Sequence, residues 1–150
     1  MRCNTGVDPK LLTDQWLIAE QVELLMIGGM LKKNKFKVKS KIPNSFKLGT
    51  GHMVFWVNKL KYLKRRHEEV KKEVIRRGFK ATIRSINLDE FPEEFRNDWK
   101  PTLEDSMILR ERLIWKLNRK PIMWRYERVN IRSRLEEFKD ELISSKCYKV

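Results

Sequence analysis

Apolar residues recur at helical spacing along most of the chain. The first stripe consists of Leu17, Leu24, Ile27 and Leu31. Such spacing indicates an amphipathic helix rather than a strand. Thr13 precedes the stripe as a side-chain cap, and Asp14 stands in the first turn, where a carboxylate suits the helix dipole. Gly28 and Gly29 are expected to weaken or bend this helix near its end.

Three further helices are predicted downstream. The second has the apolar stripe Trp56, Leu60, Leu63, His67, Val70 and Val74, and Gly78 follows it as a stop signal. Thr102 and Asp105 resemble a capping pair that opens a third helix, which ends before Pro121. The fourth has the stripe Ile131, Leu135, Phe138 and Leu142. Strand signals are few, so we expect an all-α, single compact domain of about three main helices plus an added C-terminal helix.

Composition excludes several classes of protein. With 41% hydrophobic and 10% aromatic residues in 150, the chain is not a disordered basic tail. No apolar run approaches the roughly 18 residues of a membrane helix, and the first residues lack a secretory h-region, so a cytoplasmic location is expected. Cys3 and Cys147 are predicted to be reduced thiols, and no Cys/His spacing resembles a zinc site. Without a phosphate-binding glycine motif, neither a metal nor another cofactor is expected.

The net charge of +14 bears on the class of binding partner. Residues 32–41 are a lysine-rich stretch that indicates an exposed arm. Basic residues crowd the polar side of the second helix: Lys61, Lys64, Arg65, Arg66, Lys71, Lys72, Arg76 and Arg77. A solvated helix face is one interpretation, but together with the arm and the net charge these residues favour binding to nucleic acid. Charge does not distinguish DNA from RNA, nor binding from catalysis.

Five segments carry a family resemblance. They are LTDQWLIAEQVEL (12–24), LGTGHMVFW (48–56), RRGF (76–79), PEEFRNDW (92–99) and KPIMWRY (120–126). In order and spacing they resemble the LTDQHLxAEYREL, LGAGHVTFF, KRGF, PQEFRGDY and RPTWYKYY patterns of the phage endonuclease V type pyrimidine-dimer DNA glycosylases. The resemblance implies a glycosylase-like helical domain over residues 1–126 and a helical extension over residues 127–150.

Members of that family are DNA glycosylases and abasic-site lyases that act on double-stranded DNA without a metal. Their nucleophile is the α-amine of the mature N-terminus, and a glutamate on the first helix completes the site. The resemblance therefore implies Met1 and Glu23 as catalytic residues. An ordinary α-amine has a pKa of roughly 7.7–8.0 against about 10.4 for lysine, so more of it is an uncharged nucleophile near neutrality. Because Arg2 is large, Met1 is expected to be retained.

The same resemblance implies a set of DNA-binding residues: Arg2, Gln15, Arg112, Lys116, Trp124 and Arg125. Arg112 and Lys116 are four residues apart and so share a helix face. For the basic residues an ordinary exposed position is the alternative, and for Trp124 it is core packing. The histidines are interpreted as structural, His52 near a helix N-terminus and His67 on an apolar stripe. A monomer is expected.

Three departures from the family pattern affect the expected recognition surface. Trp16 stands where the family has His, Gln21-Val22 replaces Tyr-Arg, and Met26 replaces a further Arg. Those arginines bind DNA phosphates beside the lesion in the family. The nucleophile and the acid are kept while the recognition surface is changed, which suggests a shifted target. Two alternatives stay open: a DNA-binding paralogue without turnover, and a glycosylase or nuclease for a different modified base.

Overall fold

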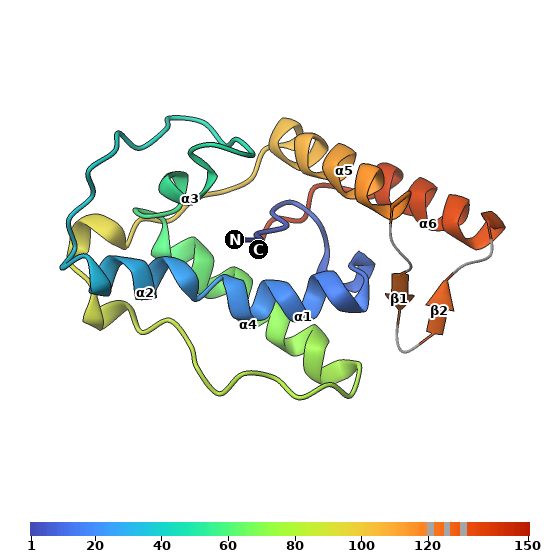
Figure 1. Ribbon diagram of the computed structural model, residues 1–150, viewed down its shortest axis with the longest axis horizontal. Helices are drawn as coiled ribbons and strands as arrows, with labels where there is room; N and C mark the ends of the chain where they lie inside the picture. Colours follow the sequence, from blue (N-terminus) through green and yellow to red (C-terminus); the bar gives the residue numbers. More distant parts are fainter. Residues whose placement is uncertain (120–121, 125–126, 130–131) are drawn as a thin grey trace.

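The computed structural model describes residues 1–119, 122–124, 127–129 and 132–150, with the side chains of residues 120–135 outside that description. The helices are α1 (Asp14–Glu23), α2 (Met26–Lys33), α3 (His52–Phe55), α4 (Leu60–Arg76), α5 (Leu103–Leu117) and α6 (Arg132–Ser144). Three short 3-10 helices cover Pro9–Leu11, Leu88–Glu90 and Glu93–Phe95. The predicted all-α single domain is confirmed (Figure 1), and within the described ranges no helix is long and apolar enough to cross a membrane.

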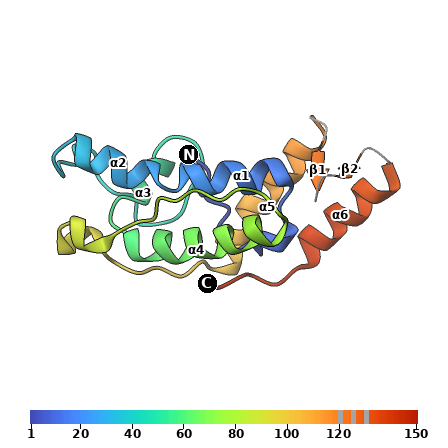
Figure 2. The ribbon, with the colours of Figure 1, turned by 90° about the horizontal axis from the view of Figure 1, so that it is seen from below.

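The centre of the molecule is the packing of α1 against α4, which lie side by side (Figure 2). Fully buried apolar side chains fill the space between them and extend toward α2: Leu17, Leu24, Ile27, Leu60, Leu63 and Val70. The N-terminal segment crosses this core before α1 begins, and its residues 3–7 are buried. Burial of a segment so close to the terminus determines where the terminal amine lies.

The first predicted helix is in fact two, and its expected weak point was wrongly placed. α1 ends at Glu23 and α2 begins at Met26, upstream of the glycine pair. Gly28 does not interrupt the helix but lies against Phe91, where a Cβ atom would be 3.0 Å from the Cζ atom of that ring. The glycine thus allows close packing, and Glu23 becomes the last residue of α1.

The other helix boundaries follow local signals in the sequence. Gly78 has a φ of +85° and closes α4, with its N–H donating to Ile75 and the next N–H donating to Val74, a Schellman motif. Thr102 and Asp105 form the predicted capping box at the start of α5. The second predicted helix differs at its start, since a short α3 precedes α4 and Trp56 lies between them, fully buried.

The C-terminal part contains an element that the sequence pattern did not predict. Two short strands, β1 (Ile122–Trp124) and β2 (Glu127–Val129), pair antiparallel and precede α6. α6 packs against α5 and buries Phe138 and Leu142 of the fourth predicted stripe in the common core, while the side chains of Ile131 and Leu135 lie outside the described residues. The division into residues 1–126 and an added 127–150 stays a prediction.

Candidate active site

The terminal amine and a carboxylate meet at the end of α1. The nitrogen of Met1 lies 3.8 Å from Oε2 of Glu23, and Nη1 of Arg2 donates to Oε1 of the same side chain at 3.1 Å. The Glu23 side chain is 26% exposed, so it faces solvent while holding two cationic partners. These are the two residues that the family resemblance assigns to catalysis.

A buried network holds the N-terminal segment against α1 and α4. The backbone N–H of Asn4 donates to Oε1 of Glu20 at 2.9 Å, and its side-chain amide donates to Oε2 at 2.7 Å. Arg66 donates to both oxygens of the same carboxylate, and Glu20 and Arg66 have no exposed side-chain surface. Thr5 and Tyr62 add a hydroxyl–hydroxyl bond. Glu20 is therefore a structural ion-pair partner three residues before Glu23.

A pocket of about 200 Å³ opens beside the amine. Three separate stretches of the chain line it: Met1, Arg2, Cys3 and Asn4; Leu48, Gly49 and His52; and Leu109, Arg112 and Lys116. The sequence resemblance singled out four of these residues, Met1, Arg2, Arg112 and Lys116. It used residues 48–52 only as a family match, although a glycine-rich turn that precedes a helix is a common place for site residues.

Positive charge dominates this pocket. Arg2, Arg112, Lys116 and the terminal amine are the charged groups among its described lining residues. Burial lowers the pKa of the Lys116 ammonium, and the nearby Arg2 and Arg112 lower it further, while Glu23 opposes them. Positive groups held close together against their mutual repulsion favour an anionic ligand, and the phosphates of DNA are of that kind.

The two histidines differ in their relation to the pocket. Nδ1 of His52 donates to the carbonyl oxygen of Lys47 at 2.8 Å, which confirms a structural hydrogen bond, yet the ring also lines the pocket. Burial lowers the pKa of His52, and the terminal amine lowers it further. His67 is a core residue as predicted, fully buried with Nε2 donating to the Gln21 carbonyl oxygen.

Three predicted DNA-binding residues are not among the described lining of the pocket, and two of them fall outside the described side chains. Gln15 is exposed in the first turn of α1, and the rise of a helix puts it about 12 Å along the axis from Glu23. Arg125 lies outside the described residues. Trp124 belongs to β1, and its side chain also lies outside the described part of the chain. Their predicted roles stay predictions.

The departures from the family pattern have distinct surroundings. Trp16 is buried, with its ring 6.4 Å from that of Phe138. Val22 and Met26 are 51% and 45% exposed and line an apolar groove that Ile83 also borders. The surface next to Glu23 therefore presents aliphatic side chains where the family pattern has arginines.

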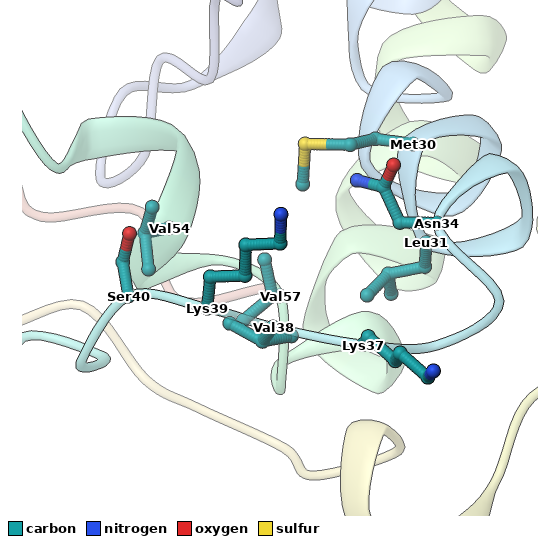
Figure 3. A pocket seen from close by; sticks show the side chains of 9 residues that line it. All are labelled: Met30, Leu31, Asn34, Lys37, Val38, Lys39, Ser40, Val54 and Val57. Carbon is teal, nitrogen blue, oxygen red and sulfur yellow. The ribbon is translucent and has the colours of Figure 1, made fainter.

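A second hollow, of about 350 Å³, lies under the basic arm of residues 32–41 and shares no lining residue with the pocket at Met1. It is lined by Met30, Leu31, Asn34, Lys37, Val38, Lys39, Ser40, Val54 and Val57. Figure 3 shows the Lys39 side chain extending into the hollow toward Met30, whereas Lys37 points away. None of the individual residues that the family resemblance assigns to catalysis or DNA binding lines this hollow, although Lys37 and Lys39 belong to the basic arm.

Comparison with known families identifies the chain. A family model described as pyrimidine dimer DNA glycosylase matches residues 2–87, which is more than half of the 150 residues. The match includes Glu23, Glu20 and His52, and it confirms the resemblance seen in the sequence motifs. The chain belongs to the pyrimidine dimer DNA glycosylase family, a family of DNA-repair enzymes whose substrate is DNA.

Proposed function

We propose that this protein is an N-glycosylase and abasic-site lyase that acts on damaged pyrimidines in double-stranded DNA. The α-amine of Met1 is the nucleophile and Glu23 is the assisting carboxylate. The observation that carries the proposal is the 3.8 Å separation of the two groups beside a basic pocket. An amine and a carboxylate at this distance supply both groups that the reaction needs, without a metal or a cofactor.

The proposed reaction begins at C1′ of the deoxyribose. The lone pair of the uncharged Met1 amine attacks C1′ of the damaged nucleotide, and the electrons of the glycosidic bond leave with the base. Glu23 takes a proton from the bound amine and passes it to O4′, so the C1′–O4′ bond breaks and a protonated imine forms between Met1 and C1′. The released base takes a proton from solvent. Glu23 stabilises the positive charge at C1′ and transfers protons. Removal of a C2′ proton expels the 3′ phosphate, and water then hydrolyses the imine to release the amine.

Basic residues around the pocket bind the strand in this proposal. Arg2, Arg112 and Lys116 face the same space as the amine, and a nucleotide placed at Met1 has phosphates on both sides. Each phosphate that these residues neutralise releases counterions, so DNA binding weakens steeply as salt rises. Gln15, Trp124 and Arg125 are proposed as outer contacts of the same strand, and the enzyme is proposed to act as a monomer.

Borohydride trapping tests the nucleophile. Incubation with an abasic duplex and borohydride is expected to give a covalent protein–DNA adduct, and peptide mapping is expected to locate it at Met1. Lys116→Met is the matched control, because Lys116 is the other amine in the pocket. The control variant should still trap. Absence of any adduct would leave only the DNA-binding paralogue, and an adduct on Lys116 would reject Met1.

The carboxylate has its own test. Glu23→Gln keeps the size of the side chain and removes its charge, so strand scission of abasic DNA is expected to slow about 100-fold or more. Cleavage at the wild-type rate would reject the role of Glu23. Mass spectrometry of the purified protein checks that Met1 is present, because a chain that begins at Arg2 lacks the proposed amine.

A second candidate is a glycosylase for a different modified base. The observation in its favour is the exposed pair Val22 and Met26 beside Glu23, where aliphatic groups replace two phosphate-binding arginines of the family pattern. A panel of duplexes that contain pyrimidine dimers, single modified bases or no damage separates the two. Base release from a modified-base duplex, with dimers untouched, favours the second candidate.

A further inference from the structure

An exposed tryptophan lies on α5 next to the pocket residues. The side chain of Trp115 is 45% exposed, whereas the other tryptophans with described side chains, Trp16, Trp56 and Trp99, are buried or half-buried. Two guanidinium groups stand over its ring. Cζ of Arg119 lies 3.6 Å from the ring centroid, and Cζ of Arg112 lies 4.8 Å from it.

This cluster adjoins the pocket at the terminal amine. Arg112 lines that pocket and also stands over the Trp115 ring, so one side chain belongs to both places. Lys116, the next residue along α5, lines the pocket as well. Arg112 is three residues before Trp115 on the same helix and so lies beside it. Arg119 follows the end of α5 at Leu117, and its guanidinium returns over the Trp115 ring. A nucleic-acid strand that leaves the pocket along α5 therefore meets this cluster.

We propose that Trp115, Arg112 and Arg119 form a stacking site for an unpaired nucleobase of DNA adjacent to the nucleotide bound at Met1. The inference rests on the proposed function only in that it places DNA at that pocket. The tryptophan face stacks on any base, since every base has a π-face. The two arginines neutralise the phosphates that accompany the base. A fully paired duplex offers no free base face, so the site distinguishes unpaired from paired DNA.

Binding measurements on two duplexes test the proposal. One is fully paired, and the other contains a tetrahydrofuran abasic analogue, which cannot form an imine and leaves the opposing base unpaired. Trp115→Ala is expected to lose about tenfold or more in affinity for the second duplex, the usual range for one stacked base. Its affinity for the paired duplex should stay within about twofold, and Trp115→Phe should restore most of the loss.

Salt dependence separates stacking from an indirect effect on the arginines. Trp115→Ala should leave the slope of log Kd against log salt unchanged, while Arg119→Ala should reduce its magnitude by about 1 and weaken both duplexes alike. Ile75→Ala, which removes a 61% exposed apolar side chain from α4, is the matched control and should change neither affinity. Melting curves check that each variant is folded.

Two results overturn the proposal. Equal weakening of both duplexes by Trp115→Ala, with a smaller salt slope, would mean that the ring only positions arginines for phosphate binding. Unchanged affinity for both would mean that the ring does not contact DNA. The outcome is separate from the catalytic proposal, because binding to the analogue requires no imine, whereas failure of borohydride trapping leaves the Trp115 measurements intact.

Discussion

Substitution of Gln for Glu should have different effects at Glu20 and Glu23, which lie one turn apart on α1. Glu20 accepts four hydrogen bonds, two from Asn4 and two from Arg66, and its side chain has no exposed surface. Glu23 has ion pairs with Met1 and Arg2 but remains partly exposed. We therefore expect Glu20→Gln to reduce stability and Glu23→Gln to reduce activity.

The magnitude for Glu20→Gln follows from the arrangement of donors. Each carboxylate oxygen accepts one donor from Asn4 and one from Arg66. Whichever oxygen becomes an amide NH2 group then faces two donors, and the buried guanidinium of Arg66 loses its counter-ion. Breaking a buried pair in this way lowers the free energy of unfolding by about 3–5 kcal/mol. For a chain of this length, the melting temperature should fall by about 6–20 °C.

Glu23→Gln should leave the melting temperature within about 3 °C of wild type, because partly exposed ion pairs contribute only about 0–1 kcal/mol. Thermal and urea unfolding of the two variants beside wild type measure stability, and single-turnover cleavage of abasic DNA, well below both melting temperatures, measures activity. If Glu20→Gln melted at the wild-type temperature, a net contribution of the buried network to stability would be refuted. An equal drop in both melting temperatures would refute the division of roles.

Three further outcomes are expected. Burial lowers the pKa of His67 below 6.5, so the unfolded chain binds more protons and the free energy of unfolding falls as pH drops from 7 through 6.5. In His67→Gln the melting temperature should therefore depend less on pH between pH 7.5 and 5.5. Gly78→Ala should lower the free energy of unfolding by about 1 kcal/mol, because its backbone is left-handed. Gly6→Ala should lower it further, because the new Cβ would also lie 2.6 Å from the Cβ of Ser106 on α5. Urea midpoints equal to that of wild type would contradict both expectations. Removal of residues 145–150 takes two carbonyl partners from the buried guanidinium of Arg110 and should lower the free energy of unfolding by about 3 kcal/mol. Arg110→Met in the shortened chain removes the unpaired guanidinium, so urea unfolding should show part of that stability recovered.

Local sequence was sufficient for most helix ends and for the chemistry expected of the chain. The capping box of Thr102 and Asp105 and the left-handed stop at Gly78 depend on groups within a few residues, so their spacing identifies them. The charge pattern predicted a polyanionic partner. The ordered motifs identified the family, and with it the pairing of Met1 with Glu23.

Long-range packing explains the features of the fold and the pocket that the periodicity of apolar residues did not predict. The close approach of Gly28 to Phe91 joins segments more than 60 residues apart. The pocket unites residues 1–4, 48–52 and 109–116, and no helical repeat relates such positions. Periodicity specifies neighbours on one helix, whereas a pocket depends on how several helices and a buried terminal segment pack together. The family motifs predicted the candidate nucleophile, the acid and the basic residues of the pocket, whereas the contributions of Leu48, Gly49 and Leu109 and the position of Trp115 beside the pocket depended on the tertiary packing.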